Sequence, residues 1–260
     1  MLHHYSENFL FNIDHLWLFF SVIFTTSSGY LINNYYDINS DELNKKNIEG
    51  LSKKFYRNCY LFHFLFSFVI LFISNLSAGW MNLVIISHFL VYLYSLKLQH
   101  WPIIGNLIVA LLCSIVLIIP YWLTDKFWEL ENFNLSENLN QLFVIFCFLL
   151  TVKREIVKDL EDIQGDLKTS SYTLPILIGE KLSKLVLGIL VIISLVFLII
   201  CSLESTKNIQ NMGFFFTMIS LLIAFIYKTY KSFEKTDFKK LSNLLKINFL
   251  AAGIWLYILS

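Results

Sequence analysis

Apolar residues fill most of the chain in long runs that short polar stretches separate. An apolar run of about 20 residues is long enough to cross a bilayer as an α-helix. We therefore expect an all-α, polytopic membrane bundle, with residues 1–260 forming one domain. The runs predict eight spans, at about residues 9–32, 58–76, 79–96, 102–123, 141–157, 182–202, 212–230 and 245–259.

Basic residues orient these spans. If the stretch after the first span is cytoplasmic and the loops alternate, all Lys and Arg except Lys126 and Lys207 lie on the cytoplasmic side. This distribution is typical of multi-pass proteins of the cell inner membrane. The two acidic stretches of the chain then lie on the same, cytoplasmic side.

The first acidic stretch runs from Asn33 to Asp41, where we expect the first helix to end in a polar loop. Asp37 and Asp41 are four residues apart and share one face of a helix, with Asn33 one turn earlier. Carboxylate and amide oxygens are ligands for Mg²⁺, which also binds phosphates. The alternative is a helix end whose acids only contact water.

The second acidic stretch runs from Lys158 to Asp166, in a predicted loop at about residues 158–180. Asp159, Asp162 and Asp166 follow an i, i+3, i+7 spacing, which again places them on one face. Two such faces on one side of a membrane favour a shared Mg²⁺–diphosphate site. Its predicted metal ligands are Asn33, Asp37, Asp41, Asp159, Asp162 and Asp166.

Basic and polar residues near the acidic stretches are candidates for substrate binding. Lys158 is the strongest because it precedes Asp159, and Lys45, Lys153 and Arg154 are further candidates for the diphosphate. Basic loops also follow from topology alone, which is the alternative for these residues. Tyr94 could stabilise an allylic cation through its ring, or simply pack against lipid. Asn106 is costly in lipid, so we expect it to face the bundle interior.

Composition limits the classes of function. The chain is 57% hydrophobic, and its formal net charge of +1 gives no nucleic-acid footprint. The bilayer is the one partner that composition predicts, and no protein partner can be inferred. A transporter remains an alternative, although it would place acidic residues near the bilayer centre rather than at span ends.

At the two acidic stretches the sequence resembles the UbiA superfamily of intramembrane prenyltransferases. The family pattern N-D-x-x-D-x-x-x-D corresponds here to residues 33–41, and D-x-x-D-x-x-G-D corresponds to residues 159–166. The segments 94–106 and 173–179 add to the resemblance. The stretch 154–162 most resembles the geranylgeranylglycerol-phosphate geranylgeranyltransferase branch, whose members are also named digeranylgeranylglyceryl phosphate synthases.

The resemblance implies a helical bundle around a central cavity that opens to the cytoplasmic side. It also implies Mg²⁺-dependent transfer of a prenyl group, in this branch geranylgeranyl, from its diphosphate to a lipophilic acceptor such as geranylgeranylglyceryl phosphate. The residues implied in catalysis are Asp37, Asp41, Asp159, Asp162 and Lys158. Those implied in substrate binding are Asn33, Asn34, Lys45, Lys153, Arg154, Tyr94 and Asn106.

The sequence departs from the family pattern in three places. Asn34 replaces an aspartate, Lys46 and Ile48 replace a proline and an arginine, and one predicted span precedes the first motif where the family usually has two. We expect either that the start of the protein lies further upstream or that a reduced protein lacks this helix. Alternatives with the same fold are prenylation of 1,4-dihydroxy-2-naphthoate, 4-hydroxybenzoate or haem, and a degenerate, inactive relative.

Overall fold

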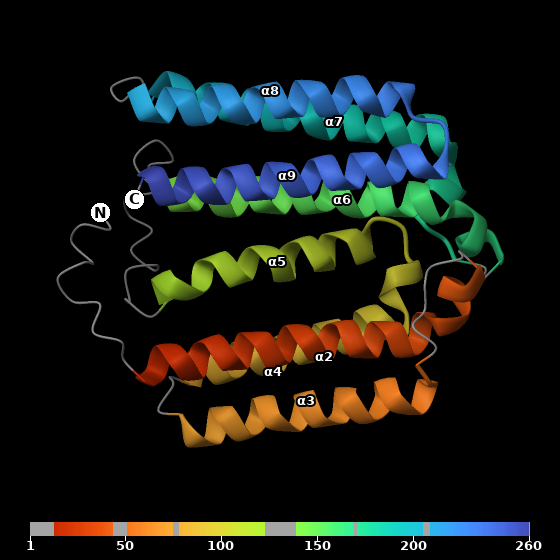
Figure 1. The fold of residues 1–260 in the computed structure, drawn as a ribbon, viewed down its shortest axis with the longest axis vertical. Helices are drawn as coiled ribbons and strands as arrows, with labels where there is room; N and C mark the ends of the chain where they lie inside the picture. Colours follow the sequence, from red (N-terminus) through yellow and green to blue (C-terminus); the bar gives the residue numbers. More distant parts are fainter. Residues whose placement is uncertain are drawn as a thin grey trace. The chain divides into compact units, whose positions relative to one another are not determined.

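The computed structural model describes residues 13–43, 51–74, 78–122, 139–168, 171–204 and 209–259, and these residues are almost entirely helical. The predicted all-α class is therefore confirmed (Figure 1). The described part of the chain contains eight α-helices and one short 3-10 helix, η1. Their bounds are α2 Ile13–Leu43, α3 Lys53–Ile73, α4 Ala78–Leu96, η1 Leu98–His100, α5 Ile104–Trp122, α6 Leu139–Lys168, α7 Leu174–Glu204, α8 Ile209–Lys231 and α9 Lys235–Leu259.

The helices form two compact units. Unit 1 comprises residues 1–105 together with Gln164–Ser171, and unit 2 comprises Asn106–Ile163 together with Tyr172–Ser260. The expectation that residues 1–260 form one domain, and that a central cavity opens to the cytoplasm, stays a prediction.

Unit 1 is built on α2, which packs against both α3 and α4. Figure 1 shows these three helices running side by side. The buried ring of His88 on α4 contacts the hydroxyls of Ser28 on α2, at 3.2 Å, and Ser67 on α3, at 2.7 Å. Trp80 Nε1 donates to Ser21 Oγ at 3.3 Å. Polar groups therefore connect all three helices of this unit.

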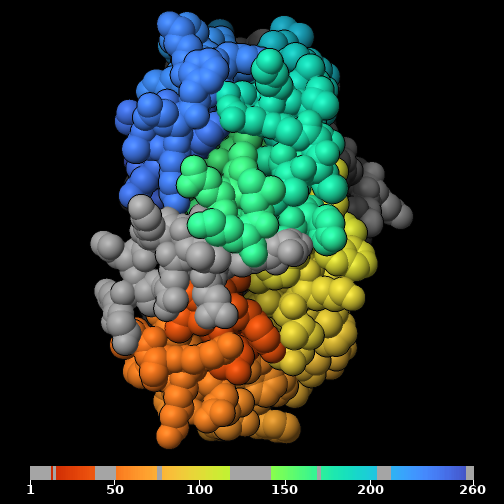
Figure 2. Space-filling view, turned by 90° about the vertical axis from the view of Figure 1, so that its right-hand side faces the viewer, coloured from red at the N-terminus to blue at the C-terminus, as the bar shows by residue number. Residues whose placement is uncertain are grey.

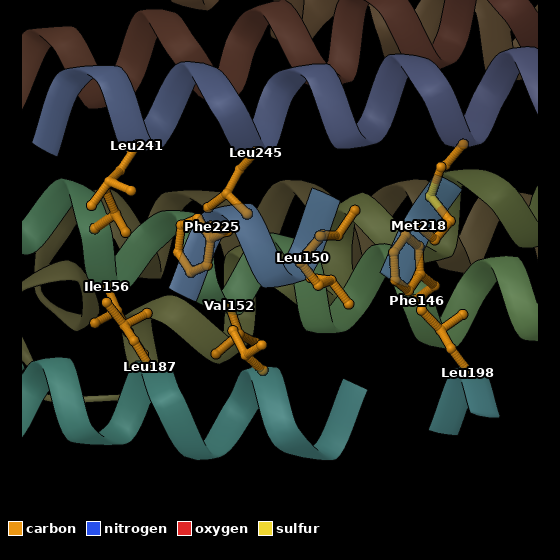
Figure 3. Close-up of a cluster of buried hydrophobic side chains, with 14 of the residues drawn as sticks. Phe146, Leu150, Val152, Ile156, Leu187, Leu198, Met218, Phe225, Leu241 and Leu245 are labelled. Atoms are coloured by element: carbon orange, nitrogen blue, oxygen red, sulfur yellow. The ribbon is translucent and has the colours of Figure 1, made fainter. Parts of the chain in front are cut away.

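Unit 2 holds the main apolar core of the described chain. Phe146 and Leu150 on α6 pack among Met218 and Phe225 on α8 and Leu245 on α9 (Figure 3). These side chains have almost no exposed surface. The period of the buried positions on each helix, three or four residues, is that of an α-helix with one face turned inward.

Five helical segments are long and apolar enough to cross a bilayer: Leu16–Ile38, Lys53–Ile73, Ala78–Leu96, Leu174–Leu203 and Met212–Lys231. They agree with five of the predicted spans. α3, orange in Figure 2, lies on the surface of unit 1 and exposes large apolar side chains such as Phe62 and Phe72. Such a surface suits lipid better than water. The protein is therefore an integral membrane protein.

The helices extend further than the apolar runs predicted. α2 continues through the first acidic stretch to Leu43, and α6 continues through the second to Lys168, so neither stretch is the predicted loop. α9 likewise begins at Lys235 rather than at about residue 245. Hydropathy marks the part of a helix that lies in lipid, whereas polar residues can continue the same helix into water.

Candidate functional site

The first acidic motif lies on the C-terminal part of α2. Asn33 Nδ2 donates a hydrogen bond to Asp37 Oδ2 at 2.6 Å, one helical turn away. Because the helix continues to Leu43, Asp41 follows on the same face, as predicted; its side chain lies outside the described part of the structure. The sequence therefore presents a polar stripe at the end of a helix that is apolar over most of its length.

Gln99 in η1 fixes the other oxygen of Asp37. Its Nε2 donates to Asp37 Oδ1 at 2.7 Å and to the Ser95 carbonyl at 3.2 Å. The turn that carries Gln99 is tight, since a Cβ on Gly105 would approach the Leu98 carbonyl oxygen to 2.8 Å. Gln99 was not predicted as a site residue. The only sequence signal was its place within the segment 94–106 that contributes to the family resemblance.

A chain of polar contacts in unit 1 links this turn to the end of the second motif. His100 Nε2 lies 3.4 Å from Gln99 Nε2, and His100 Nδ1 lies 2.8 Å from Ser171 Oγ. The backbone N–H of Ser171 donates to the Asp166 carbonyl oxygen at 3.0 Å. Asp166 thus belongs to the same compact unit as Asp37, although the two are far apart in sequence.

The rest of the second motif lies in unit 2, on α6. Asp159, Asp162 and Asp166 keep the predicted one-face spacing because the helix is continuous to Lys168. Asn106, buried at the start of α5, donates from Nδ2 to Asp159 Oδ2 at 2.9 Å. The prediction that Asn106 faces the interior is therefore confirmed. Lys235, the first residue of α9, places its Nζ 3.9 Å from Asp162 Oδ1.

Three charged residues of α6 form an ionic group just before Asp159. The buried carboxylate of Glu155 contacts Arg154 Nη1 at 2.7 Å and Lys158 Nζ at 3.1 Å. The nearby negative charge of Glu155 raises the pKa of Lys158, so this side chain remains an ammonium. Two cations share one carboxylate, which leaves a net positive charge beside the second motif.

Lys153 behaves differently from its neighbours. Its side chain is fully buried in unit 2, and its Nζ donates to Ser194 Oγ on α7 at 2.6 Å. A predicted role in diphosphate binding is untested for this residue and for the others named from the sequence. Asn34 and Tyr94 lie on α2 and α4, half-buried, whereas Lys45 lies outside the described residues.

The donor set of the first motif suits a hard cation. Asn33 Oδ1 is buried and accepts no hydrogen bond from the described residues, which is costly for an amide oxygen without a ligand. Beside it lies the Asp37 carboxylate. Within the described residues, no three His, Cys, Asp or Glu side chains converge on one point. A metal would therefore need the amide oxygen of Asn33, or oxygens from a substrate, to complete its coordination.

Comparisons with known proteins identify the family of this chain. The model of the "UbiA prenyltransferase family" matches residues 5–251. The chain is 33% identical over 240 residues to the digeranylgeranylglyceryl phosphate synthase of Methanosphaera stadtmanae. The matched region covers 90% of this chain and 83% of the relative. It is 30% identical over 246 residues to the synthase of the same name from Methanobrevibacter smithii, with 90% and 82% covered.

One solved structure has a similar fold. It is described as "Structural and mechanistic insights into the biosynthesis of Digeranylgeranylglyceryl phosphate synthase in membranes", and it superposes with a TM-score of 0.62. The identity is 24%, and the match covers 94% of this chain and 84% of that chain. At this identity the likeness establishes the fold alone.

Proposed function

We propose that this chain, which belongs to the UbiA prenyltransferase family, makes digeranylgeranylglyceryl phosphate. It would transfer a geranylgeranyl group from geranylgeranyl diphosphate to the free hydroxyl of geranylgeranylglyceryl phosphate. The observation that carries this proposal is the similarity, over 90% of the chain, to relatives that bear the name of this synthase. Both aspartate motifs fall within the matched family region.

The proposed metal ligands are the oxygens of the two motifs: Asn33, Asp37, Asp41, Asp159, Asp162 and Asp166. The orphaned Asn33 oxygen and the one-face spacing of the acids on α2 and α6 support this assignment. When bound, Mg²⁺ would neutralise the negative charge of the leaving diphosphate. Asn34 removes one carboxylate from the family pattern but keeps an oxygen that can coordinate.

The protein's own residues would position and stabilise the reactants. Lys158 and Arg154 supply fixed positive charge for the diphosphate, with Lys45 as a further proposed contact. The fully buried Lys153 donates to Ser194 instead and is not proposed as a contact. Asn106 and Gln99 orient the carboxylates of Asp159 and Asp37.

As the bond between C1 of the prenyl group and the diphosphate oxygen breaks, the diphosphate keeps the electron pair. The acceptor hydroxyl then bonds to C1 and gives its proton to the released diphosphate. The ring of Tyr94 is the proposed stabiliser of the allylic cation.

The proposed location is the cell inner membrane, with both acidic motifs on the cytoplasmic side. The distribution of Lys and Arg along the sequence supports this orientation. Within unit 2, the contact between Lys235 and Asp162 places the start of α9 beside the end of α6, as the same orientation requires. Prenyl diphosphate and a lipophilic acceptor would then meet at the membrane surface.

A transfer assay on the purified protein in detergent tests the proposal. The reaction contains radiolabelled geranylgeranyl diphosphate, geranylgeranylglyceryl phosphate, and Mg²⁺ or EDTA. We expect Mg²⁺-dependent product, and a loss of roughly 100- to 1000-fold in kcat for Asp37→Asn and for Asp162→Asn, since each removes charge from the metal site. Glu161→Gln is the matched control, because Glu161 lies on α6 but off the face of the motif.

The outcomes separate the alternatives. Full activity of both aspartate variants would overturn the assignment of the motifs. Product from 1,4-dihydroxy-2-naphthoate, 4-hydroxybenzoate or haem, and none from geranylgeranylglyceryl phosphate, would change the acceptor but keep the family chemistry. Folded protein that is silent with every acceptor would indicate an inactive relative.

A further inference from the structure

Lys235 forms an ion pair with Asp162, an aspartate of the second motif. It belongs to neither family motif, and it contacts Asp162 from the start of a different helix. The separation of 3.9 Å between Nζ and Asp162 Oδ1 is longer than a direct hydrogen bond. The side chain of Asp162 is 14% exposed and that of Lys235 is 45% exposed, so solvent and ligands can reach the lysine more readily than the carboxylate.

The turn that carries Lys235 is fixed on both sides. The buried ammonium of Lys184 on α7 donates to the Ser232 carbonyl oxygen and lies over the ring of Phe233, 4.6 Å from its centroid. On the other side, the Asp237 carboxylate accepts hydrogen bonds from the backbone N–H groups of Phe233, at 3.3 Å, and Glu234, at 3.4 Å. These contacts fix the backbone from which Lys235 extends.

The position of Lys235 is unfavourable for a cation unless an anion is near. The first turn of a helix carries a partial positive charge, which favours Asp and Glu and disfavours Lys. The ion pair with Asp162, at 3.9 Å between Nζ and Oδ1, offsets this only weakly. An ammonium at the start of a helix is suited to binding phosphate oxygens, because the positive end of the helix dipole adds to its charge.

We propose that Lys235 binds the diphosphate of the prenyl donor, exchanging Asp162 for a diphosphate oxygen when the donor binds. This inference rests on the proposed function, in which Asp162 is a metal ligand. A carboxylate that coordinates a divalent cation no longer attracts the neighbouring ammonium, and the two cations repel each other. The negatively charged diphosphate can bind the metal and the ammonium of Lys235 at the same time. Lys235 would then lower the KM for the donor rather than serve the acceptor, which also carries a phosphate.

Because Lys235 and a metal compete for Asp162, removing Lys235 should change the affinities for pyrophosphate and for Mg²⁺ in opposite directions. The full-length protein in detergent is titrated calorimetrically with MgCl₂ alone, and then with inorganic pyrophosphate at saturating MgCl₂. For Lys235→Ala we expect about tenfold weaker pyrophosphate binding, because one charge-assisted hydrogen bond is lost. We expect Mg²⁺ alone to bind equally or up to about threefold more tightly, because a competing cation is gone.

Two further variants serve as controls. Lys235→Arg should keep pyrophosphate affinity within about threefold, because a guanidinium also binds phosphate oxygens. Lys239→Ala removes an equal charge from the exposed surface of α9, where Lys239 has no recorded partner, and should change neither affinity. In turnover assays, Lys235→Ala should raise the KM for geranylgeranyl diphosphate about tenfold and leave the KM for the acceptor unchanged.

Each other result counts against the inference. If both affinities of Lys235→Ala fall together, Lys235 only supports the structure of the metal site. Unchanged pyrophosphate affinity, or a raised KM for the acceptor alone, would also overturn it. These results leave the proposed function standing, whereas a wild-type protein that binds no pyrophosphate in the presence of Mg²⁺ would overturn the proposed function and this inference with it.

Discussion

In unit 1 the carboxylate of Asp37 accepts hydrogen bonds from two amides, Asn33 and Gln99, whereas in unit 2 Asp162 faces the ammonium of Lys235. Amide donors orient a carboxylate without neutralising its charge. An ammonium neutralises the carboxylate and must move or find another anion when a metal arrives. The first motif is therefore prepared for a metal, and the second is prepared for a metal that brings an anion.

The interiors of the two units also differ in polarity. The helices of unit 1 are joined by the ring of His88 and the hydroxyls of Ser28 and Ser67, whereas unit 2 is filled by side chains such as Phe146 and Phe225. Lipid tails are as apolar as the side chains, so moving a side chain from lipid into the protein interior yields little hydrophobic free energy. Polar contacts and close packing therefore both hold membrane helices together. The comparison predicts that substitutions will act differently in the two units.

The largest effect on stability is expected from the apolar core of unit 2. Phe225→Ala should lower the free energy of unfolding by about 3 kcal/mol, because the fully buried ring leaves a cavity among tightly packed helices. Unfolding by SDS in mixed micelles, followed by intrinsic fluorescence, measures this change. Phe225→Leu is the control and should cost less than about 1.5 kcal/mol. Equal losses in the two variants would mean that this core is not closely packed.

A smaller effect, on activity rather than on folding, is expected for Gln99→Leu. Removing the amide that orients Asp37 should reduce kcat/KM by roughly 10- to 100-fold, as substitutions behind a metal ligand generally do. The thermal midpoint should change little. Asn82→Leu removes an exposed amide from α4, away from the motif, and should leave kcat/KM unchanged. Wild-type activity in Gln99→Leu would show that Asp37 needs no support from η1.

His88→Leu should destabilise unit 1 by about 1 kcal/mol, the scale of polar contacts between membrane helices. The loss is modest because Ser28 and Ser67 can both still donate to carbonyls of their own helices, at 2.7 Å each. The thermal midpoint in detergent measures it. His63→Leu is the control, since the hydrogen bond of His63 among the described residues is to the Cys59 carbonyl of its own helix, and its contact with α2 is the ring of Phe24. The polar account of unit 1 fails if the two variants lose equal stability.

The smallest effect is expected at the turn before α9. The backbone N–H of Phe233 holds the pKa of Asp237 below its usual value, so the ionised carboxylate stabilises the folded protein. This contribution is present above the unfolded pKa and is lost as the pH falls through the folded pKa. Asp237→Asn should therefore have a lower thermal midpoint than wild type at pH 7. The two midpoints should converge once the pH has fallen below the folded pKa of Asp237, and a difference that persists with the carboxyl group fully protonated would exclude the ionised carboxylate as its cause.

The sequence predicted those features that depend on local pattern. Apolar runs located the helices, and the spacing of Asp159, Asp162 and Asp166 placed them on one face. The cost of an amide in lipid was enough to place Asn106 in the interior, where it meets Asp159. Each of these predictions depends either on the spacing of residues within one helix or on the cost of placing a single polar side chain in lipid.

Features that depend on contacts between helices were missed. Gln99 and Lys235 each reach an aspartate on another helix, and nothing in their own neighbourhood distinguishes them from the surrounding polar residues. The extent of α2 and α6 was also missed, because Asn, Asp and Gly favour a loop where no tertiary contact is known. Packing against the rest of the unit overrides this preference.

Gly179 interrupts α7 with φ 81° and ψ 161°, a backbone conformation that glycine alone adopts readily. A Cβ at this position would meet no atom within 4 Å, so there is ample space for a larger side chain. Selection at this codon would therefore act on the main chain alone. Any side chain at this position would therefore be penalised by backbone strain and not by lack of room.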